Sequence, residues 1–543
     1  MTSVIPAGVA KRKSGVPGKQ SWEWGIAPGM SHRVEIALEP LGQTLKVERG
    51  TPLRDVLFSY GVEFPCGGQG RCRGCRVRLL GGSAPVTPEQ EAILSPDELR
   101  EGWRLACQLT AEGPLALQVA QWETAILTDH SSFSFTPREG RGIAVDLGTT
   151  TVVAQLLDLQ SGRVLGVRTA LNPQARYGAD VMSRIQFALA SGGHGKLVDL
   201  IRSKIGSLIQ RLVSSTDSEE TEVRSVVVVG NTVMHHFLGG FDVEPLSHWP
   251  FETTAGGAHE LPASELGWKL RGDPRVRLLP CLGGFVGSDI LAGVLATEIH
   301  ESDSLVALVD LGTNGEIAIG RRERILCAST AAGPAFEGGG ISMGMQATTG
   351  AITAVRIEEG GLRCRVQGEV PARGICGSGL VDAVAAGLDL GVIEPSGRFS
   401  QPSSRFEISP GVSLTQRDVR QLQLAKGATA AGIRILLKRW NAGPDDLSRV
   451  HLAGAFGNYV DPASARRLGL IDFPDEAVEP AGNTALLGAK LALFADETEA
   501  GGLAEICARI RHVPLAADPE FQEIFVESMA FPARGGSGGA ASR

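Results

Sequence analysis

The sequence predicts a multidomain chain in which a small α+β domain precedes a larger, two-lobed α/β core. Three observations predict this architecture. The chain has 543 residues, which at roughly 150 residues per domain corresponds to three or four units. Four cysteines are grouped in the first part of the chain. In the second part, an apolar strand ending in Asp-Leu-Gly-Thr occurs twice, at 142–158 and at 305–320.

The four grouped cysteines have the spacing of iron–sulfur ligands. Cys66, Cys72 and Cys75 lie in the string CGGQGRCRGC, and Cys107 follows after 31 further residues. Three thiolates within ten residues and a distant fourth are typical of a 2Fe–2S ferredoxin, and glycines in the loop let backbone N–H groups approach the sulfurs. A structural zinc site would more usually contain two C-x-x-C pairs, and this string has one. We therefore predict that these cysteines hold a 2Fe–2S cluster that carries single electrons.

The segments around this loop predict a β-grasp domain. Alternating apolar residues and a Thr-Pro helix start indicate two strands and a helix before the loop, and two strands with a short helix between them after it. The predicted elements, in order, are strands at Arg33–Leu38 and Gln43–Glu48, a helix at Thr51–Gly61, a strand at Cys75–Leu80, a helix at Pro88–Leu94 and a strand at Leu115–Val119.

Composition and charge exclude several classes of protein. The net charge is −8, which argues against a nucleic-acid partner because such binding relies on a basic surface. No stretch approaches the roughly 18 apolar residues of a membrane helix, and the N-terminus lacks the apolar region of a signal peptide. We therefore expect a cytoplasmic protein with no membrane partner. The remaining cysteines show no ligand spacing and are expected to be reduced and partly buried: Cys281, Cys327, Cys364, Cys376 and Cys507.

Shifts in composition suggest where the domains begin and end. Residues 1–30 and 533–543 are predicted to be disordered because they are rich in small and polar residues. The ferredoxin-type domain is expected at 31–122, a linker at 123–141, a first core lobe at 142–300 and a second at 301–532.

The two repeated motifs predict a nucleotide site. GIAVDLGTTTVVAQLLD (Gly142–Asp158) and LVALVDLGTNGEIAIG (Leu305–Gly320) each read as a strand, a Gly-Thr turn and a second strand. The N–H groups and threonine hydroxyl of such a turn can bind an anion, and the aspartate that ends the first strand can hold magnesium through water. Two facing hairpins would bind a nucleoside triphosphate between two lobes. The predicted residues are Asp146, Gly148, Thr149 and Thr150 in the first hairpin and Asp310, Gly312, Thr313 and Asn314 in the second.

This pair of motifs resembles the phosphate motifs of the acetate kinase, sugar kinase, Hsp70 and actin superfamily. The resemblance implies an actin-like (ribonuclease H-like) ATPase core with mixed five-stranded sheets, binding ATP and Mg²⁺. Cys281–Thr297 and Gly482–Phe494 are similar to the two connecting helices of that superfamily. HLAGAFGNYV (His451–Val460) is similar to its adenosine motif, with Gly454 and Gly457 as candidate contacts. A P-loop is excluded because Gly195-Lys196 is followed by leucine.

A ferredoxin domain ahead of this core resembles one family, the ATP-dependent reductive activators of corrinoid proteins. The likeness extends over residues 31–530 and includes the strings LNPQARYGADVMSRI (Leu171–Ile185), VVVVGNTVMHHFLG (Val226–Gly239) and STAAGPAFEGGGISMG (Ser329–Gly344). It implies ATP-dependent one-electron reduction of Co(II) to Co(I) in a corrinoid protein or cobalamin-dependent methyltransferase. It also implies a reductase or ferredoxin that loads the cluster, and it allows a homodimer.

Other functions and other site residues stay open at this level. A small-molecule kinase with a redox-sensing ferredoxin domain, or a redox-gated ATP-dependent binding module, would contain the same two parts. Asn231, after an apolar strand, is a candidate for the cleft. Glu316 is either a group that orients the attacking water or half of a salt bridge. His235 and His236 are more simply structural, and Arg71, Arg73 and Arg76 either steer an acidic partner or offset the cluster's charge.

Overall fold

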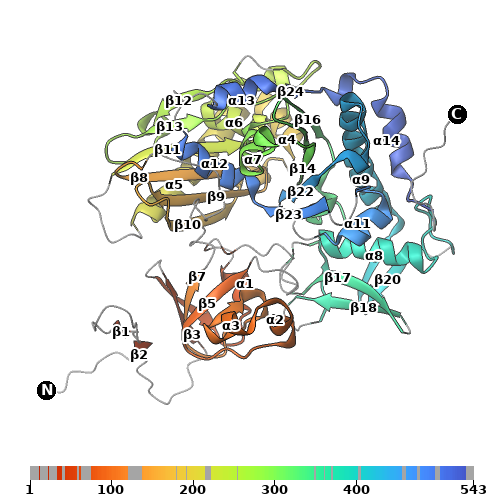
Figure 1. The fold of residues 1–543 in the computed structure, drawn as a ribbon, viewed down its shortest axis with the longest axis horizontal. Coiled ribbons are helices and arrows are strands. Elements are labelled where there is room, and N and C mark those ends of the chain that lie inside the picture. The colour runs from red at the N-terminus through yellow and green to blue at the C-terminus, as the bar shows by residue number, and fades with distance from the viewer. Residues whose placement is uncertain are drawn as a thin grey trace. The chain divides into compact units, whose positions relative to one another are not determined.

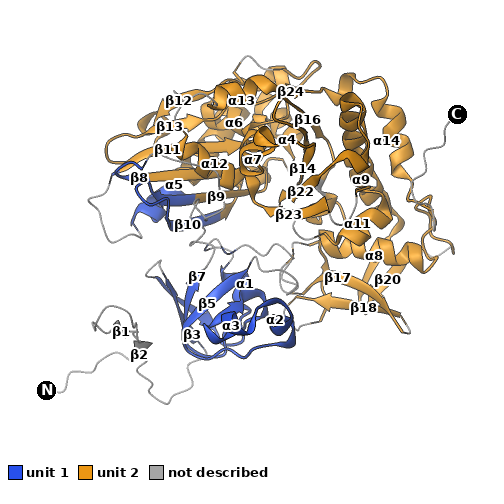
Figure 2. Ribbon diagram, viewed as in Figure 1, with its two compact units in different colours: residues 1–141, 155–169, 208–222 blue, residues 142–154, 170–207, 223–543 orange. Residues whose placement is uncertain are grey.

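The computed structural model describes 11–12, 22–23, 33–39, 43–57, 60, 62, 75–119, 137–178, 180–190, 192–214, 222–252, 255–312, 314–345, 347, 350–359, 361–367, 371–401, 405–454, 460–473, 477–495 and 502–533. The chain forms two compact units (Figure 2). The first comprises 1–141, 155–169 and 208–222, and the second comprises 142–154, 170–207 and 223–543. No helix among the described residues is both long and apolar enough to cross a bilayer.

A five-stranded sheet with the order β4-β3-β7-β5-β6 forms the ferredoxin part of the chain (Figure 1). Strand β3 pairs antiparallel with β4 and parallel with β7, and its core side chains, such as Ile36 and Leu38, are fully buried. The elements are β3 (Arg33–Glu39), β4 (Gln43–Glu48), α1 (Leu53–Leu57), β5 (Arg76–Gly81), α2 (Pro88–Ile93), α3 (Pro96–Arg100), β6 (Trp103–Leu105) and β7 (Leu115–Val119). The predicted β-grasp order is confirmed.

Two of these elements were not predicted, because each is too short to show a period. Helix α3 begins with a capping box in which Ser95 accepts from the N–H of Glu98 and the Glu98 carboxylate accepts in return. Strand β6 has three residues. Nearer the N-terminus the strands β1 (Lys11–Arg12) and β2 (Trp22–Glu23) pair antiparallel, within a stretch expected to be disordered. Of the expected linker only residues 137–141 are described, and residues 534–543 lie outside the described residues.

The first lobe is built on a sheet with the order β10-β9-β8-β11-β13-β12. Both the first predicted hairpin and the buried strand before Asn231 are present. The strands are β8 (Arg141–Leu147), β9 (Thr151–Asp158), β10 (Val164–Leu171), β11 (Val223–Gly230), β12 (His259–Pro262) and β13 (Arg275–Leu278), with helices α4 (Val181–Leu189), α5 (Gly193–Ser214) and α6 (Thr232–Gly239).

The second lobe repeats this plan with the order β23-β22-β14-β15-β16-β24. Its elements are β14 (Val306–Leu311), β15 (Gly315–Arg321), β16 (Arg324–Thr330), β22 (Arg449–Ala453), β23 (Val478–Gly482) and β24 (Ile510–His512), with α7 (Ser288–Ala296), α9 (Gln416–Trp440), α11 (Pro462–Leu468), α12 (Thr484–Phe494), α13 (Leu503–Arg509) and α14 (Phe521–Met529). Among the described residues, the main sheet of each lobe therefore has six strands, and the expectation of five was wrong. The edge strands β12 and β24 have only four and three residues, too few to show alternation.

An insertion in the second lobe carries two small sheets and helix α8 (Gly377–Asp389). Its strands are β17 (Ala351–Glu358), β18 (Gly361–Val366), β19 (Gly374–Ile375), β20 (Arg405–Ser409) and β21 (Val412–Thr415). The sheet order is β18-β17-β19, and β20 pairs with β21.

The two connecting helices lie where the sequence predicted them and cross in close contact. A Cβ atom at Gly488 of α12 would lie 2.0 Å from the carbonyl oxygen of Ala292 in α7. Only glycine permits this approach of two helix backbones.

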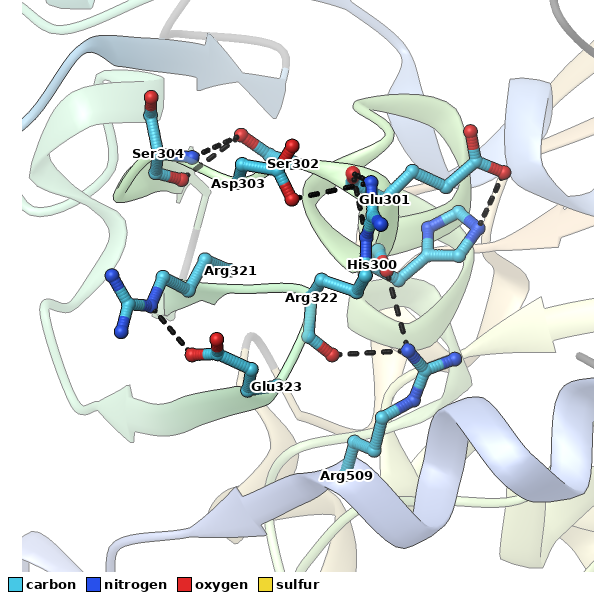
Figure 3. A network of polar contacts seen from close by, with 9 residues as sticks. All are labelled: His300, Glu301, Ser302, Asp303, Ser304, Arg321, Arg322, Glu323 and Arg509. Carbon is cyan, nitrogen blue, oxygen red and sulfur yellow. Dashed lines mark hydrogen bonds and ion pairs between the residues drawn. The ribbon is translucent and has the colours of Figure 1, made fainter.

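The segment that leads from α7 into β14 is braced by a polar network (Figure 3). Arg509 of α13 donates to the carbonyl oxygens of His300, at 3.4 Å, and Arg322, at 3.0 Å. Arg322 in turn donates to the carbonyl oxygen of Glu301 at 2.7 Å and is in an ion pair with Asp303. A C-terminal helix thus holds the connection between the lobes against the β15–β16 turn.

Candidate functional site

The first hairpin places its polar residues at the end of β8. Asp146 is near the end of this strand, and the N–H of Gly148 donates to the carbonyl oxygen of Thr151 at 2.9 Å, which closes the turn. Asn231 Nδ2 donates to Thr149 Oγ1 at 2.9 Å, while Asn231 Oδ1 caps α6 by accepting from the N–H of Met234. The structure therefore brings the sequence candidates Thr149 and Asn231 together.

The second hairpin has the same form. Asp310 lies opposite Glu316 in the antiparallel register of β14 and β15. Gly454 approaches from the end of β22: its φ is 82°, and a Cβ there would lie 2.2 Å from Asp310 Oδ1. Only glycine leaves that carboxylate room. Gly312 and Asn314 flank the turn, and their backbones are joined by a 3.1 Å hydrogen bond from the N–H of Gly312. The other two candidates, Thr313 and Gly457, lie outside the described residues.

Two side-chain hydrogen bonds connect distant segments within this second unit. Thr150 Oγ1 donates to Glu337 Oε2 at 2.9 Å, so the first hairpin contacts the 3-10 turn Pro334–Glu337 of the second lobe. Asn483, which caps α12, donates through Nδ2 to Asp146 Oδ2 at 2.8 Å. The first phosphate hairpin is therefore tied both to the second lobe and to a connecting helix.

Five carboxylates influence one another around the two hairpins, at the position of the expected nucleotide cleft. Burial raises the pKa of Asp146 to about 6, and the hydrogen bond from Asn483 partly offsets this rise. Burial, with the charge of Asp146 and then Glu337, raises the pKa of Asp310 to about 7. Asp289 at the start of α7 also has a pKa raised to about 7, by burial and then by Asp310 and Asp146. These three aspartates are half-buried, so each keeps part of its surface exposed.

Glu316 is the most enclosed member of this carboxylate group, with 7 % of its surface exposed. Burial, followed by repulsion from Asp289 and Asp310, raises its pKa well above the usual value. A salt bridge at Glu316, the alternative that the sequence left open, does not occur among the ion pairs of the described residues. Besides the charges of Asp289 and Asp310, a hydrogen bond from the Asn314 side chain acts on this carboxyl group and opposes the rise in its pKa.

The cleft can be tested for its fit to magnesium. Among the described side chains, no three of His, Cys, Asp or Glu are close enough together to hold a metal ion directly. Magnesium commonly keeps several waters and uses one or two carboxylates with substrate phosphates. Partly exposed, mutually repelling aspartates fit an ion held in that way, through water and the nucleotide.

Sequence reasoning missed three residues that interact with the predicted ones: Asp289, Glu337 and Asn483. Asp289 lies in GFVGSDI and Glu337 in PAFEGGG, each a single carboxylate in a short segment of apolar and small residues. That isolation was a usable signal, because a lone carboxylate in an apolar segment needs a reason to be there. Asn483 gave the weaker signal of an ordinary helix cap.

The predicted cluster ligands are only partly within the described residues. Cys66 and Cys72 lie outside them, as do Arg71 and Arg73. Strands β5 and β6 pair Arg76 with Leu105, and the N–H of Ala106 donates to the carbonyl oxygen of Cys75 at 2.9 Å. Cys75 and Cys107 are thereby brought to the same end of the sheet although 31 residues separate them, which fits their joint use as thiolate ligands. Gln108 Nε2 lies 3.7 Å from Cys107 Sγ and donates to it.

The remaining candidates have structural roles. His235 and His236 are buried in α6 among aromatic rings, and burial lowers the pKa of His235 to about 3. Arg76 pairs with Glu98 at 3.0 Å and lies over the Trp103 ring. The five scattered cysteines are in no disulfide, as predicted.

Comparisons with known proteins agree with this division of the chain. The model described as the 2Fe-2S iron-sulfur cluster binding domain matches residues 36–112, the RACo middle region matches 141–302, and the C-terminal domain of RACo, the ASKHA domain, matches 304–537. ASKHA abbreviates the superfamily of the phosphate hairpins. The fold class is confirmed, and these matches support a 2Fe–2S cluster and ATP binding.

Similar proteins extend the likeness over most of the chain. The corrinoid activation enzyme RamQ of Eubacterium limosum is 34% identical over 422 residues, covering 72% of this chain and 70% of that protein. A Co(II) methylated amine-specific corrinoid protein reductase of Methanosarcina barkeri is 30% identical over 430 residues, covering 73% and 77%. A solved structure, a reductive activator for a corrinoid, iron–sulfur protein, is 26% identical with a TM-score of 0.65 and covers 92% of this chain and 98% of that one. With its ferredoxin unit, middle region and nucleotide-binding lobes in this order, the chain belongs to the RACo family of reductive activators of corrinoid proteins.

Proposed function

We propose that this protein reduces the Co(II) form of a corrinoid protein to Co(I) by one electron, and that ATP drives the reduction. The observation that carries the proposal is the presence, in one chain, of the Cys75–Cys107 end of a ferredoxin sheet and of two Asp-Leu-Gly-Thr hairpins whose buried aspartates influence one another. The names of similar proteins, which act on corrinoid proteins, support the same substrate class. The family assignment favours this activity over a kinase or a binding module.

A cluster held by Cys66, Cys72, Cys75 and Cys107 supplies single electrons, at about −400 mV if it is of the plant type. Co(I) is a strong reductant, and every 59 mV or so of unfavourable gap lowers a one-electron equilibrium tenfold. A ferredoxin domain alone would therefore not reduce Co(II) to Co(I) to a useful extent. The ATPase core of the chain has to shift the electron-transfer equilibrium.

The residues of the cleft suggest how ATP binding shifts the electron-transfer equilibrium. We assign Thr149, Thr150, Gly312, Thr313 and Asn314 to the phosphates, Gly454 and Gly457 to the adenosine side, and Asp146 and Asp310 to a magnesium ion held through water. Asn231 positions the Thr149 hydroxyl, and Glu316 orients the attacking water. Because Thr150 contacts Glu337 of the second lobe, a phosphate at the first hairpin competes with this contact, and binding then favours one lobe arrangement over another.

The further parts of the proposal concern partners and setting. The corrinoid partner is a carrier protein or a cobalamin-dependent methyltransferase, and a reductase or ferredoxin loads the cluster. The protein works in the cytoplasm and as a monomer or homodimer.

The test mixes the purified protein with a Co(II) corrinoid protein and follows Co(I) by its absorbance. We expect Co(I) only when reductant, ATP and an intact cluster are all present. Asp310→Asn should lower ATP hydrolysis about 100-fold or more and leave the iron content unchanged. Asp158→Asn is the control, because Asp158 lies at the end of β9 in the first hairpin, away from its turn. Equal Co(I) formation without nucleotide would refute the proposal. The Co(II) form should also stimulate hydrolysis more than the methylated form, since a ligand acts only through differential affinity.

A further inference from the structure

The turn of the first phosphate hairpin is held from behind by the segment Leu171–Ile185, for which no role has been given above. Asn172, with 1 % of its surface exposed, donates through Nδ2 to the carbonyl oxygen of Gly148 at 3.0 Å. Its own backbone N–H donates to the carbonyl oxygen of Thr150 at 2.9 Å. One residue thus engages the carbonyls on both sides of Thr149.

Arg184 of α4 engages the carbonyl between them. This side chain is fully buried, and Nη2 donates to the carbonyl oxygen of Thr149 at 2.7 Å. Nε donates to the carbonyl oxygen of Gly178 at 3.0 Å, and Nη1 to Oε1 of Gln174 at 3.3 Å. Three consecutive carbonyls of the turn therefore point toward donors from this segment.

Because peptide groups are planar and trans, the direction of these carbonyls also fixes the direction of the N–H groups of the turn. In a trans peptide the N–H points away from the carbonyl of the same unit. The carbonyls of Gly148 and Thr149 face Asn172 and Arg184, so the N–H groups of Thr149 and Thr150 face the other way. Neither N–H donates to a backbone carbonyl of the described residues. Successive N–H groups that point to one side form an anion-binding concavity.

The charge of Arg184 also supports an anion site at this turn. Burial lowers the pKa of Arg184 to about 10, so the guanidinium remains protonated at neutral pH. Its hydrogen bonds go to neutral oxygens and to the Met234 sulfur, and it is in no ion pair among the described residues. The carboxylate that influences it, Asp180, caps α4 by accepting from the N–H of Ser183. A buried cation without a carboxylate partner is costly, and an anion bound at the turn would supply the missing charge.

We propose that Arg184 and Asn172 are positioning residues for the polyphosphate of the nucleotide: they turn three carbonyls of the first hairpin away, so that the N–H groups of Thr149 and Thr150 face the phosphates. This inference rests on the proposed binding of ATP in this cleft. Neither residue touches the nucleotide, and each acts through the backbone of the turn.

The experiment measures ATP affinity by calorimetry on the full chain, with the melting temperature of each variant recorded alongside. Arg184→Met should weaken ATP binding at least tenfold. Arg184→Lys should restore part of the loss, because it keeps the charge and one donor but not the planar fork. The matched control is Arg202→Met: Arg202 is another partly buried arginine of the first lobe whose guanidinium donates to backbone carbonyls, those of Leu238 and Glu265. It should lower the melting temperature and leave ATP affinity within threefold.

The outcomes separate this inference from the proposed function. If the unchanged chain binds no ATP, the proposed function fails. If it binds ATP and Arg184→Met binds equally well, or if Arg202→Met loses as much affinity, only the positioning role is refuted. If Arg184→Met does not fold, the ATP affinity of Asn172→Asp tests the positioning role instead. It keeps the acceptor for the Gln174 N–H but removes the donor to Gly148, and a loss of less than threefold would refute the inference.

Discussion

The aspartates of the cleft predict a specific dependence of stability on pH. The folded-state pKa of Asp310 is about 7 against an ordinary 3.8. A carboxyl group with a raised pKa contributes stability that is complete below its unfolded value and is lost as pH rises through its folded value. The nucleotide-free, metal-free protein should therefore lose stability between pH 4 and 7 through Asp310, and Asp146, with a pKa of about 6, acts in the same direction.

Removing one of these charges should relieve the loss. We expect Asp310→Asn to melt at nearly the wild-type temperature at pH 5 and about 2–4 °C higher at pH 8, if the relieved repulsion is worth about 1 kcal/mol. Thermal unfolding in the presence of a chelator measures this difference. A variant that melts below the wild type at pH 8 would show that the Asp310 carboxylate is stabilised by a partner rather than opposed by its neighbours.

At the scale of elements, the network in Figure 3 predicts that α13 stabilises the connection between α7 and β14. Arg509→Met removes the donors to the carbonyl oxygens of His300 and Arg322. Hydrogen bonds from a charged donor are worth about 1.5–3 kcal/mol, so amide exchange should accelerate in residues 299–304 and 322–324. Mass spectrometry of exchanged peptides measures it. Arg511→Met, an exposed arginine of β24, is the control, and equal acceleration in both variants would contradict the bracing role.

The packing of α14 against α9 depends on an unusual lysine. Lys426 is buried, and its Nζ donates to the carbonyl oxygen of Ala530, just after α14, and lies 5.4 Å from the centre of the Phe531 ring. Burial lowers its pKa from 10.5 to about 7. Between these values the unfolded chain holds the proton that the folded chain has lost, so this group makes the protein more stable as pH rises.

Lys426→Met removes that dependence. We expect the melting temperature of the wild type to rise relative to that of Lys426→Met as pH increases from 7 to 9.5. Lys438→Met is the control. Lys438 is an exposed lysine of the same helix, α9, and it pairs with Glu520. The difference in melting temperature between wild type and this variant should not grow with pH. A constant difference between wild type and Lys426→Met would mean that the lysine is charged in the folded protein throughout.

At the scale of the whole molecule, the ferredoxin sheet buries apolar side chains of its own, such as Ile36, Leu105 and Leu117. The cleft residues described above belong to the second compact unit. Cys107→Ser should therefore abolish the cluster without loss of ATP binding, since domains with separate cores fold separately. Iron analysis and calorimetry on the same sample test this. Wild-type protein with four irons per chain, or with zinc, would refute the cluster assignment, and loss of ATP affinity in the variant would refute the independence of the two parts.

The sequence by itself determined those features that depend on neighbours along the chain. The cysteine spacing, the alternation at 33–38 and 43–48 and the two Asp-Leu-Gly-Thr turns were all readable, because ligand spacing, strand period and turn chemistry are local properties. The short strands β6, β12 and β24 were not readable, because three or four residues carry no period and their pairing is set by the sheet that they join.

Only the tertiary structure decided which distant groups meet. Thr150 and Glu337 are 187 positions apart and Asp146 and Asn483 are 337 apart, and no local pattern relates such residues. The same holds for Asp289, whose raised pKa comes from burial and from the charges of two other strands. No local pattern in the sequence singled out Arg184. Its place behind the phosphate turn follows from the packing of α4 on the first lobe, since a hydrogen bond requires three-dimensional proximity that chain spacing does not specify.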